Sequence, residues 1–226
     1  MESTPVSRPS SRRPLLDSYY ERYLEAENSA AFIRQVGERY SVATLERLAE
    51  SGDRMTRRGA VLALGFLADF ESNNVLGAAL RDRDRGVRTL AENAIRLVWC
   101  RIGTPSQRQE LGAIIRLNNA QQFAEAIARA SSLIDIAPWI AESWNQRAIA
   151  YFSTSKFLDA IRDCQQALEI NPYHFGAAAG MGYCYVQLRE HASAAECFRR
   201  ALKLNPGMES ARAKLIEVQR VLKDGE

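Results

Sequence analysis

The sequence has few of the residues from which metal centres are usually built. Two histidines and four cysteines occur among 226 residues, and no two cysteines form a Cys-x-x-Cys pair. A zinc site needs such closely spaced ligands, so we expect no metal and no cofactor. The cysteines, at positions 100, 164, 184 and 197, are expected to be reduced and half-buried on helices, which favours a cytoplasmic location.

The motifs of common enzyme families are missing as well. The chain has no glycine-rich phosphate loop, no paired carboxylates in an irregular loop, and no serine or cysteine nucleophile in a motif with histidine. Both histidines, His174 and His191, stand at turns between expected helices, where we expect them to be solvated. The sequence therefore predicts a protein that is not an enzyme.

Long apolar runs are also lacking. The longest, from Ala60 to Ala68, is far shorter than the roughly 20 residues that span a bilayer, so no membrane span is expected. Residues 1–16 have no apolar core and are rich in Ser, Pro and Arg, so they predict a disordered basic tail and no secretory signal. No segment alternates apolar and polar residues as a half-buried strand does, so the expected fold is all-α.

Charge of both signs is present and nearly balanced. The formal net charge is +3, from 30 Lys and Arg against 27 Asp and Glu. Residues 17–104 hold 13 Arg and 13 acids, and residues 105–226 hold 14 cations and 13 acids. Neither part is basic enough to predict strong non-specific binding to nucleic acid.

A repeat with a period of 34 residues organises the C-terminal half. Identical residues recur where the segment from Trp144 is aligned with the one from Ala178. The matching pairs are Tyr151 and Tyr185, Ala160 and Ala194, Ala167 and Ala201, Leu168 and Leu202, Asn171 and Asn205, and Pro172 and Pro206. A fainter copy precedes them. Self-similarity at such a period is typical of stacked helical repeats.

The period and residue types resemble the tetratricopeptide repeat over residues of about 107–223. Ala148 and Gly182 are small enough to let the two helices of a repeat approach closely, and Pro172 and Pro206 follow a helix end. Residues 208–223 look like the helix that closes such an array. The resemblance implies an α-solenoid of stacked antiparallel helix pairs.

The N-terminal half repeats with a different period, of 31 residues. Asp53, Arg57 and Ala60 fall on Asp84, Arg88 and Ala91 after this shift. The pattern resembles HEAT-like repeats over about 42–101, with each Asp expected to cap a longer helix. Gly and Pro within residues 102–105 predict the boundary between a HEAT-like region, 17–104, and a tetratricopeptide region, 105–226. We expect the two regions to stack as one continuous solenoid.

The resemblance implies a concave groove lined by the first helix of each tetratricopeptide repeat. Helical spacing predicts which side chains turn away from the partner helix and face this groove. They are Leu111, Ile115, Asn118, Asn145, Ile149, Phe152, Tyr183, Val186 and Gln187. The wall is largely apolar, so we expect an adaptor that binds a protein or peptide partner.

The alternative is a solenoid that binds nucleic acid through an arginine ridge. The ridge would use residues at equivalent helix starts of the HEAT-like half, namely Arg54, Arg57, Arg85 and Arg88. The balanced charge of this half argues against it, and nucleic acid is not the expected partner. The sequence leaves open whether Arg57 and Arg88 are exposed or pair with the neighbouring acids.

Overall fold

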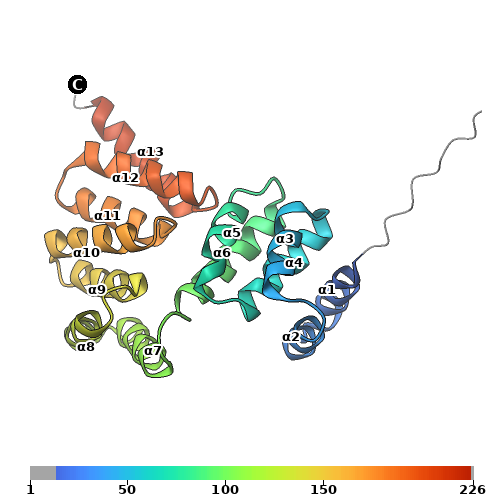
Figure 1. Ribbon diagram of the computed structural model, residues 1–226. Coiled ribbons are helices and arrows are strands. Elements are labelled where there is room, and N and C mark those ends of the chain that lie inside the picture. The colour runs from blue at the N-terminus through green and yellow to red at the C-terminus, as the bar shows by residue number, and fades with distance from the viewer. Residues whose placement is uncertain (1–13, 225–226) are drawn as a thin grey trace, which may run out of the picture.

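The computed structural model describes residues 14–224, which contain thirteen α-helices, one short 3-10 helix and no strand (Figure 1). The predicted all-α solenoid is confirmed. The helices of the N-terminal half are α1 (Leu15–Ala26), α2 (Ser29–Gly37), α3 (Val42–Ser51), α4 (Arg54–Leu67), η1 (Phe70–Ser72), α5 (Asn73–Ala79) and α6 (Arg85–Trp99). Those of the C-terminal half are α7 (Pro105–Asn119), α8 (Phe123–Ile136), α9 (Ala141–Ser153), α10 (Phe157–Ile170), α11 (Phe175–Gln187), α12 (His191–Leu204) and α13 (Glu209–Asp224).

The predicted tail over residues 1–16 falls mostly outside the described residues, which begin at 14. Its last two residues are helical, since Leu15 and Leu16 open α1. Leu16 is fully buried in the core of the N-terminal half. The predicted tail is therefore at least two residues too long.

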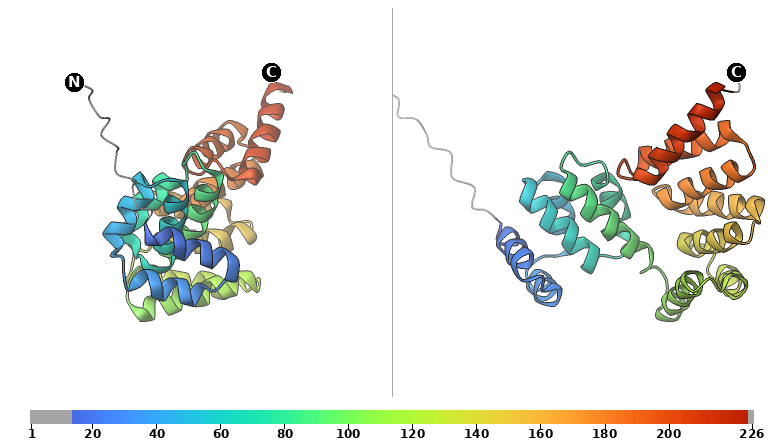
Figure 2. Two further views of the ribbon diagram at one scale, coloured as in Figure 1. Left: turned by 90° about the vertical axis from the view of Figure 1, so that its right-hand side faces the viewer. Right: turned by 180° about the vertical axis from the view of Figure 1, so that it is seen from behind.

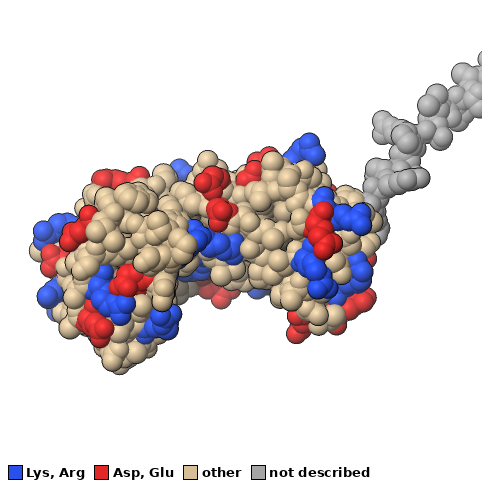
Figure 3. All heavy atoms as spheres, turned by 60° about the horizontal axis from the view of Figure 1, so that its bottom comes forward, with Lys and Arg blue, Asp and Glu red and all other residues tan. Residues whose placement is uncertain are grey.

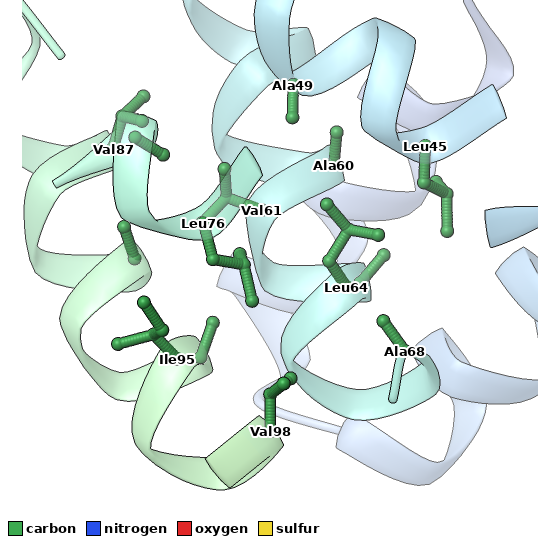
Figure 4. Close-up of a cluster of buried hydrophobic side chains, with 14 of the residues drawn as sticks. Leu45, Ala49, Ala60, Val61, Leu64, Ala68, Leu76, Val87, Ile95 and Val98 are labelled. Carbon is green, nitrogen blue, oxygen red and sulfur yellow. The ribbon is translucent and has the colours of Figure 1, made fainter. Parts of the chain in front are cut away.

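A single core holds the N-terminal half together, and α4 lies at its centre. Helix α4 packs against α3 and α6, and Ala60, Ala63 and Leu64 on it are fully buried (Figure 4). The predicted Asp caps are confirmed: the Asp53 carboxylate accepts the amides of residues 55 and 56, and the Asp84 carboxylate accepts that of residue 87. Each cap satisfies backbone N–H groups that the first helical turn leaves without a partner.

Consecutive helices of the C-terminal half pack as antiparallel neighbours from α7 to α13. The small residues predicted at the helix contact are needed there, because a Cβ atom on Gly182 would lie only 2.8 Å from the Phe198 ring. The terminal helix α13 buries Ala211 and Val218 against the array and exposes Ile216. It packs on α12 at the C-terminal end of the described residues.

The two halves meet in a way that the repeat pattern does not predict. Helix α6 ends at Trp99 and α7 begins at Pro105, with Gly103 between them at a φ of +85°. The chain then curves so that α11 to α13 return toward α5 and α6 (Figures 1 and 2). The turn between α10 and α11 contacts α5 and α6, and Leu204 and Met208 also pack against the N-terminal core. These contacts replace the expected stacking of successive helices across the boundary.

Candidate protein-binding groove

The junction between the halves is built from polar and aromatic side chains. Trp99 on α6 stacks on His174, with ring centroids 4.3 Å apart and planes 18° apart. The Trp99 indole Nε1 donates a hydrogen bond of 2.7 Å to Asn73 Oδ1, and Asn73 Nδ2 donates one of 2.9 Å to Asn171 Oδ1. These contacts tie α5 and α6 to the turn before α11 and set the position of the groove relative to α6.

His174 is a buried structural residue, and the prediction of a solvated histidine is wrong. It is 1% exposed, and its Nδ1 accepts the Ala177 amide as the N-cap of α11. An accepting Nδ1 places the ring proton on Nε2, which donates to Glu142 Oε2 at 2.9 Å. The local sequence predicted a solvated turn, but Trp99 packs against His174 and covers it.

Glu142 is the buried carboxylate that accepts the hydrogen bond from His174. Burial alone raises the pKa of its carboxyl, but hydrogen bonds from His174, Gln146 and Asn145 outweigh burial and hold the pKa below its ordinary value. A carboxylate kept ionised inside the protein needs such donors. The start of α9 is therefore locked to the start of α11, one repeat further along the chain.

A cavity of about 280 Å³ lies between α9 and α11, next to this junction. Four of the predicted groove residues, Asn145, Ile149, Phe152 and Tyr183, line it. The remaining residues of its wall are mostly small or apolar, and they are Arg96, Ala148, Cys164, Gly176, Ala179, Gly180, Cys184 and Met208. The helical spacing thus brings side chains from two successive repeats to one apolar concavity.

Two lining residues come from segments that the groove prediction did not include. Arg96 belongs to α6 of the N-terminal half, and Met208 belongs to the turn before α13. The Arg96 guanidinium lies 4.7 Å from the Phe175 ring centroid, and its Nη2 bonds Glu92 Oε1 at 3.2 Å. No local signal marks Arg96, because the folding back of the solenoid brings α6 to the groove.

The other predicted groove residues lie outside this cavity. Leu111 is fully buried in the core of α7 to α9, so it does not face the groove. Asn118 is 8% exposed and donates from Nδ2 to the backbone and side-chain oxygens of residue 146, so it serves helix packing. Ile115 and Val186 are half-buried against neighbouring helices, and Gln187 is exposed beyond the cavity.

The predicted arginine ridge does not form a continuous surface. Arg57 is 5% exposed, and its guanidinium makes two hydrogen bonds to the Asp82 carboxylate, at 2.8 and 2.9 Å. Arg88 donates to the backbone carbonyls of residues 82 and 83, whereas Arg54 and Arg85 are exposed. Arg57 therefore pairs with a neighbouring acid. The prediction that it forms part of an exposed anion-binding ridge is wrong.

A second ion pair stiffens the same turn. Arg58 makes two hydrogen bonds to the Asp84 carboxylate, at 2.7 and 2.9 Å. The hydrogen bonds from Arg58, together with the amide of residue 87 that Asp84 caps, lower the pKa of Asp84 to about 2. Desolvation raises the pKa of Asp82, but its hydrogen bonds from Arg57 and the amide of residue 84 leave the pKa lowered.

A larger hollow of about 550 Å³ lies between α6 and the turn that joins α12 to α13. Charged side chains dominate its wall, which consists of Arg85, Arg88, Thr89, Glu92, Asn205, Pro206, Gly207, Glu209 and Arg212. Half of the predicted ridge therefore lines a concave surface between the two halves.

Within residues 14–224, no group of His, Cys, Asp and Glu has the arrangement of a metal site. No helix in this range is long and apolar enough to cross a membrane. All four cysteines lie in the described part and are free. Cys100 and Cys197 are half-buried as predicted, whereas Cys164 and Cys184 are buried. Burial raises the pKa of Cys100 and of Cys184 to about 12, which leaves their thiols protonated and unreactive at neutral pH.

The fold and the groove together define a helical-repeat protein, and family models match both kinds of repeat. The model of HEAT repeats matches residues 23–96, and those of the tetratricopeptide repeat match residues 141–174 and 176–208. The chain combines HEAT repeats in its N-terminal half with tetratricopeptide repeats in its C-terminal half. The HEAT match begins upstream of the predicted start at about 42, so it includes α2.

Relatives and solved structures that contain tetratricopeptide repeats resemble part of this chain. A TPR repeat-containing protein of Rhizobium etli is 30% identical over 101 residues, which are 45% of this chain and 50% of the relative. The first TPR of Spaghetti (RPAP3), solved bound to an HSP90 peptide, superposes with a TM-score of 0.52 at 23% identity, covering 54% of this chain and 97% of that one. The Sgt2 TPR domain of Aspergillus fumigatus gives a TM-score of 0.52 at 18% identity over 54% and 82%. The chain spans about half the length of the Rhizobium etli relative.

Proposed function

We propose that this protein is an interaction adaptor that holds a segment of a partner protein in the groove between α9 and α11. The observation that supports the proposal most directly is the apolar cavity of about 280 Å³, to which two successive repeats contribute Ile149, Phe152 and Tyr183. Ile149 is 41% exposed, so an apolar side chain of a partner could bury it. Burial of apolar area at such a site favours association by roughly 25 cal/mol per Å² before the costs of ordering are subtracted.

The polar groups at the groove suit a polypeptide ligand. Asn145 and Tyr183 line the cavity beside the apolar side chains, and an amide or a phenol can bond to a partner's backbone. The first TPR of Spaghetti, whose fold the C-terminal half shares, holds a peptide in its solved structure. An adaptor role also accords with the repeat architecture, because solenoids present extended concave surfaces.

The test is capture of a partner by the full-length chain, followed by variants of the groove. Ile149→Glu and Tyr183→Ala should each weaken binding of the captured partner, because one places a charge in the apolar wall and the other removes a ring from it. Leu158→Glu is the matched control, since Leu158 is 62% exposed on α10 and does not line the cavity. Undiminished binding by the folded Ile149→Glu and Tyr183→Ala double variant would refute the groove.

A further inference from the structure

We propose that the HEAT half takes part in recognition and selects an acidic partner segment. An apolar side chain of the segment enters the groove, and neighbouring Asp or Glu side chains pair with Arg96 and with the arginines of the larger hollow. The inference rests on the proposed function, because it names the chemistry of the segment that the groove would hold. The binding surface then spans both kinds of repeat.

The groove and the larger hollow adjoin each other. Glu92 lines the hollow and Arg96 lines the groove, and these two side chains are joined by the contact of 3.2 Å between them. On the opposite side, Gly207 lines the hollow and the next residue, Met208, lines the groove. An extended segment anchored in the groove therefore reaches the hollow within a few residues, at about 3.3 Å per residue.

The charges along this path are mostly positive. Arg96 is the one charged residue that lines the groove. Arg85, Arg88 and Arg212 line the hollow, where Glu92 and Glu209 offset part of their charge. Figure 3 shows Lys and Arg side chains between the two halves, with Asp and Glu side chains beside them. Since the path has four arginines against two glutamates, it complements a segment that carries carboxylates.

Arg96 is placed to receive such a carboxylate. Its side chain is 51% exposed, and stacking on the Phe175 ring orients the guanidinium without using its N–H groups. A guanidinium carries five N–H donors, of which the structure uses one, Nη2, in a hydrogen bond to Glu92. The remaining donors suit a two-point contact with a carboxylate, which a planar guanidinium forms well.

A polypeptide fits this surface better than a nucleic acid. The groove beside Arg96 is lined by Ile149, Phe152 and Met208, which need an apolar side chain to fill the cavity. A phosphate backbone that followed the arginines would also pass Glu92 and Glu209. Binding of nucleic acid is therefore the alternative result that the test below must distinguish.

The test selects short random peptides displayed on phage against the full-length chain. We expect the selected peptides to combine an apolar residue with Asp or Glu. A selected peptide is then synthesised with an amidated C-terminus, so that only side-chain carboxylates are available, together with a version in which Asn and Gln replace Asp and Glu. Fluorescence anisotropy should show that this neutral version binds roughly fivefold or more weakly, and that added salt narrows the difference.

Variants separate the inference from the proposed function on which it rests. Arg96→Gln should weaken the acidic peptide by about fivefold and leave the neutral version unaffected. Arg162→Gln is the matched control, because Arg162 is also an exposed arginine paired within its helix, to Asp159 at 3.0 Å, but lies outside both hollows. Circular dichroism confirms that each variant is folded.

Each outcome bears on one claim. If Ile149→Glu abolishes peptide binding and Arg96→Gln leaves it unchanged, the groove stands and the acidic partner is refuted. Selection of peptides without acidic residues would refute it as well. Failure to select any peptide, or binding insensitive to Ile149→Glu, would overturn the proposed function itself. If Arg96→Gln weakens a single-stranded oligonucleotide and no peptide, the surface belongs to nucleic acid and the inference is wrong.

Discussion

Trp99 at the end of α6 lies almost flat against His174 at the start of α11, with 4.3 Å between their ring centroids. The two residues are 75 positions apart in the chain. Their contact, with the hydrogen bonds around it, joins the HEAT half to the tetratricopeptide half and brings Arg96 to the groove.

The indole of Trp99 should be a major source of stability at the junction. Trp99→Ala should lower the free energy of unfolding by about 3–5 kcal/mol, because it leaves a cavity against His174 and Phe175. Trp99→Phe should cost less, about 1–3 kcal/mol, since a ring remains but Asn73 Oδ1 loses its donor. Urea unfolding measures both, and a loss below 1 kcal/mol for Trp99→Ala would contradict the packing.

The partnership of His174 with Glu142 should show strong coupling. His174→Ala removes a donor from a buried carboxylate and should cost about 3–5 kcal/mol. In the double variant with Glu142→Gln the buried charge is gone, so the cost of His174→Ala should fall by 1 kcal/mol or more. A double-mutant cycle of unfolding free energies measures this, and additive effects would mean that the two side chains act independently.

Gly77 should be required for the close approach of the two halves. A Cβ atom there would overlap the Tyr173 ring, so Gly77→Ala should destabilise the protein by about 1–3 kcal/mol despite the better helix propensity of Ala. Gly112→Ala is the control, because a Cβ atom there would meet only Arg116 Nη1, at 3.5 Å. This substitution should stabilise α7 by about 0.5–1 kcal/mol. Equal effects of the two substitutions on the melting temperature would refute the contact.

Asp84 should make stability depend on pH in acid. Its pKa is lowered to about 2 in the folded protein, so its contribution is complete above the ordinary value near 3.8 and is lost as the pH falls toward 2. Asp84→Asn keeps an N-cap but removes the charge, so it should flatten the stability profile between pH 4 and pH 2. Asp84→Ala should be less stable than Asp84→Asn by about 1 kcal/mol at neutral pH, because it also removes the N-cap. Urea unfolding at neutral pH measures this difference.

The local features of the fold could be read from the sequence because they depend on short spacings. Asp53 and Asp84 cap their helices as their shared place in the repeat predicted. Helical spacing likewise brought Ile149 and Phe152 to one surface, with Tyr183 from the next repeat. In each case neighbouring residues within one or two repeats determine the outcome.

The features that depend on distant contacts could not be read in this way. Arg57 is buried because Asp82, 25 residues away, meets it across the repeat, and the repeat pattern alone allowed an exposed arginine. His174 stands in a turn that is solvated unless another part of the chain covers it, and Trp99 does so. Arg96 lies at the groove because the solenoid folds back on itself. Its curvature is the sum of many small packing angles, which no short spacing in the sequence predicts.

The contact of Trp99 with His174 also limits how the chain can grow. Solenoids ordinarily gain or lose whole repeats with little penalty, because each unit touches only its neighbours. Here the helices α7 to α10 form a loop that is closed at both ends, by the chain itself and by the junction. A 34-residue unit inserted within that loop would carry His174 away from Trp99, whereas one added after α12 would not. The junction therefore constrains the number of repeats between α6 and α11.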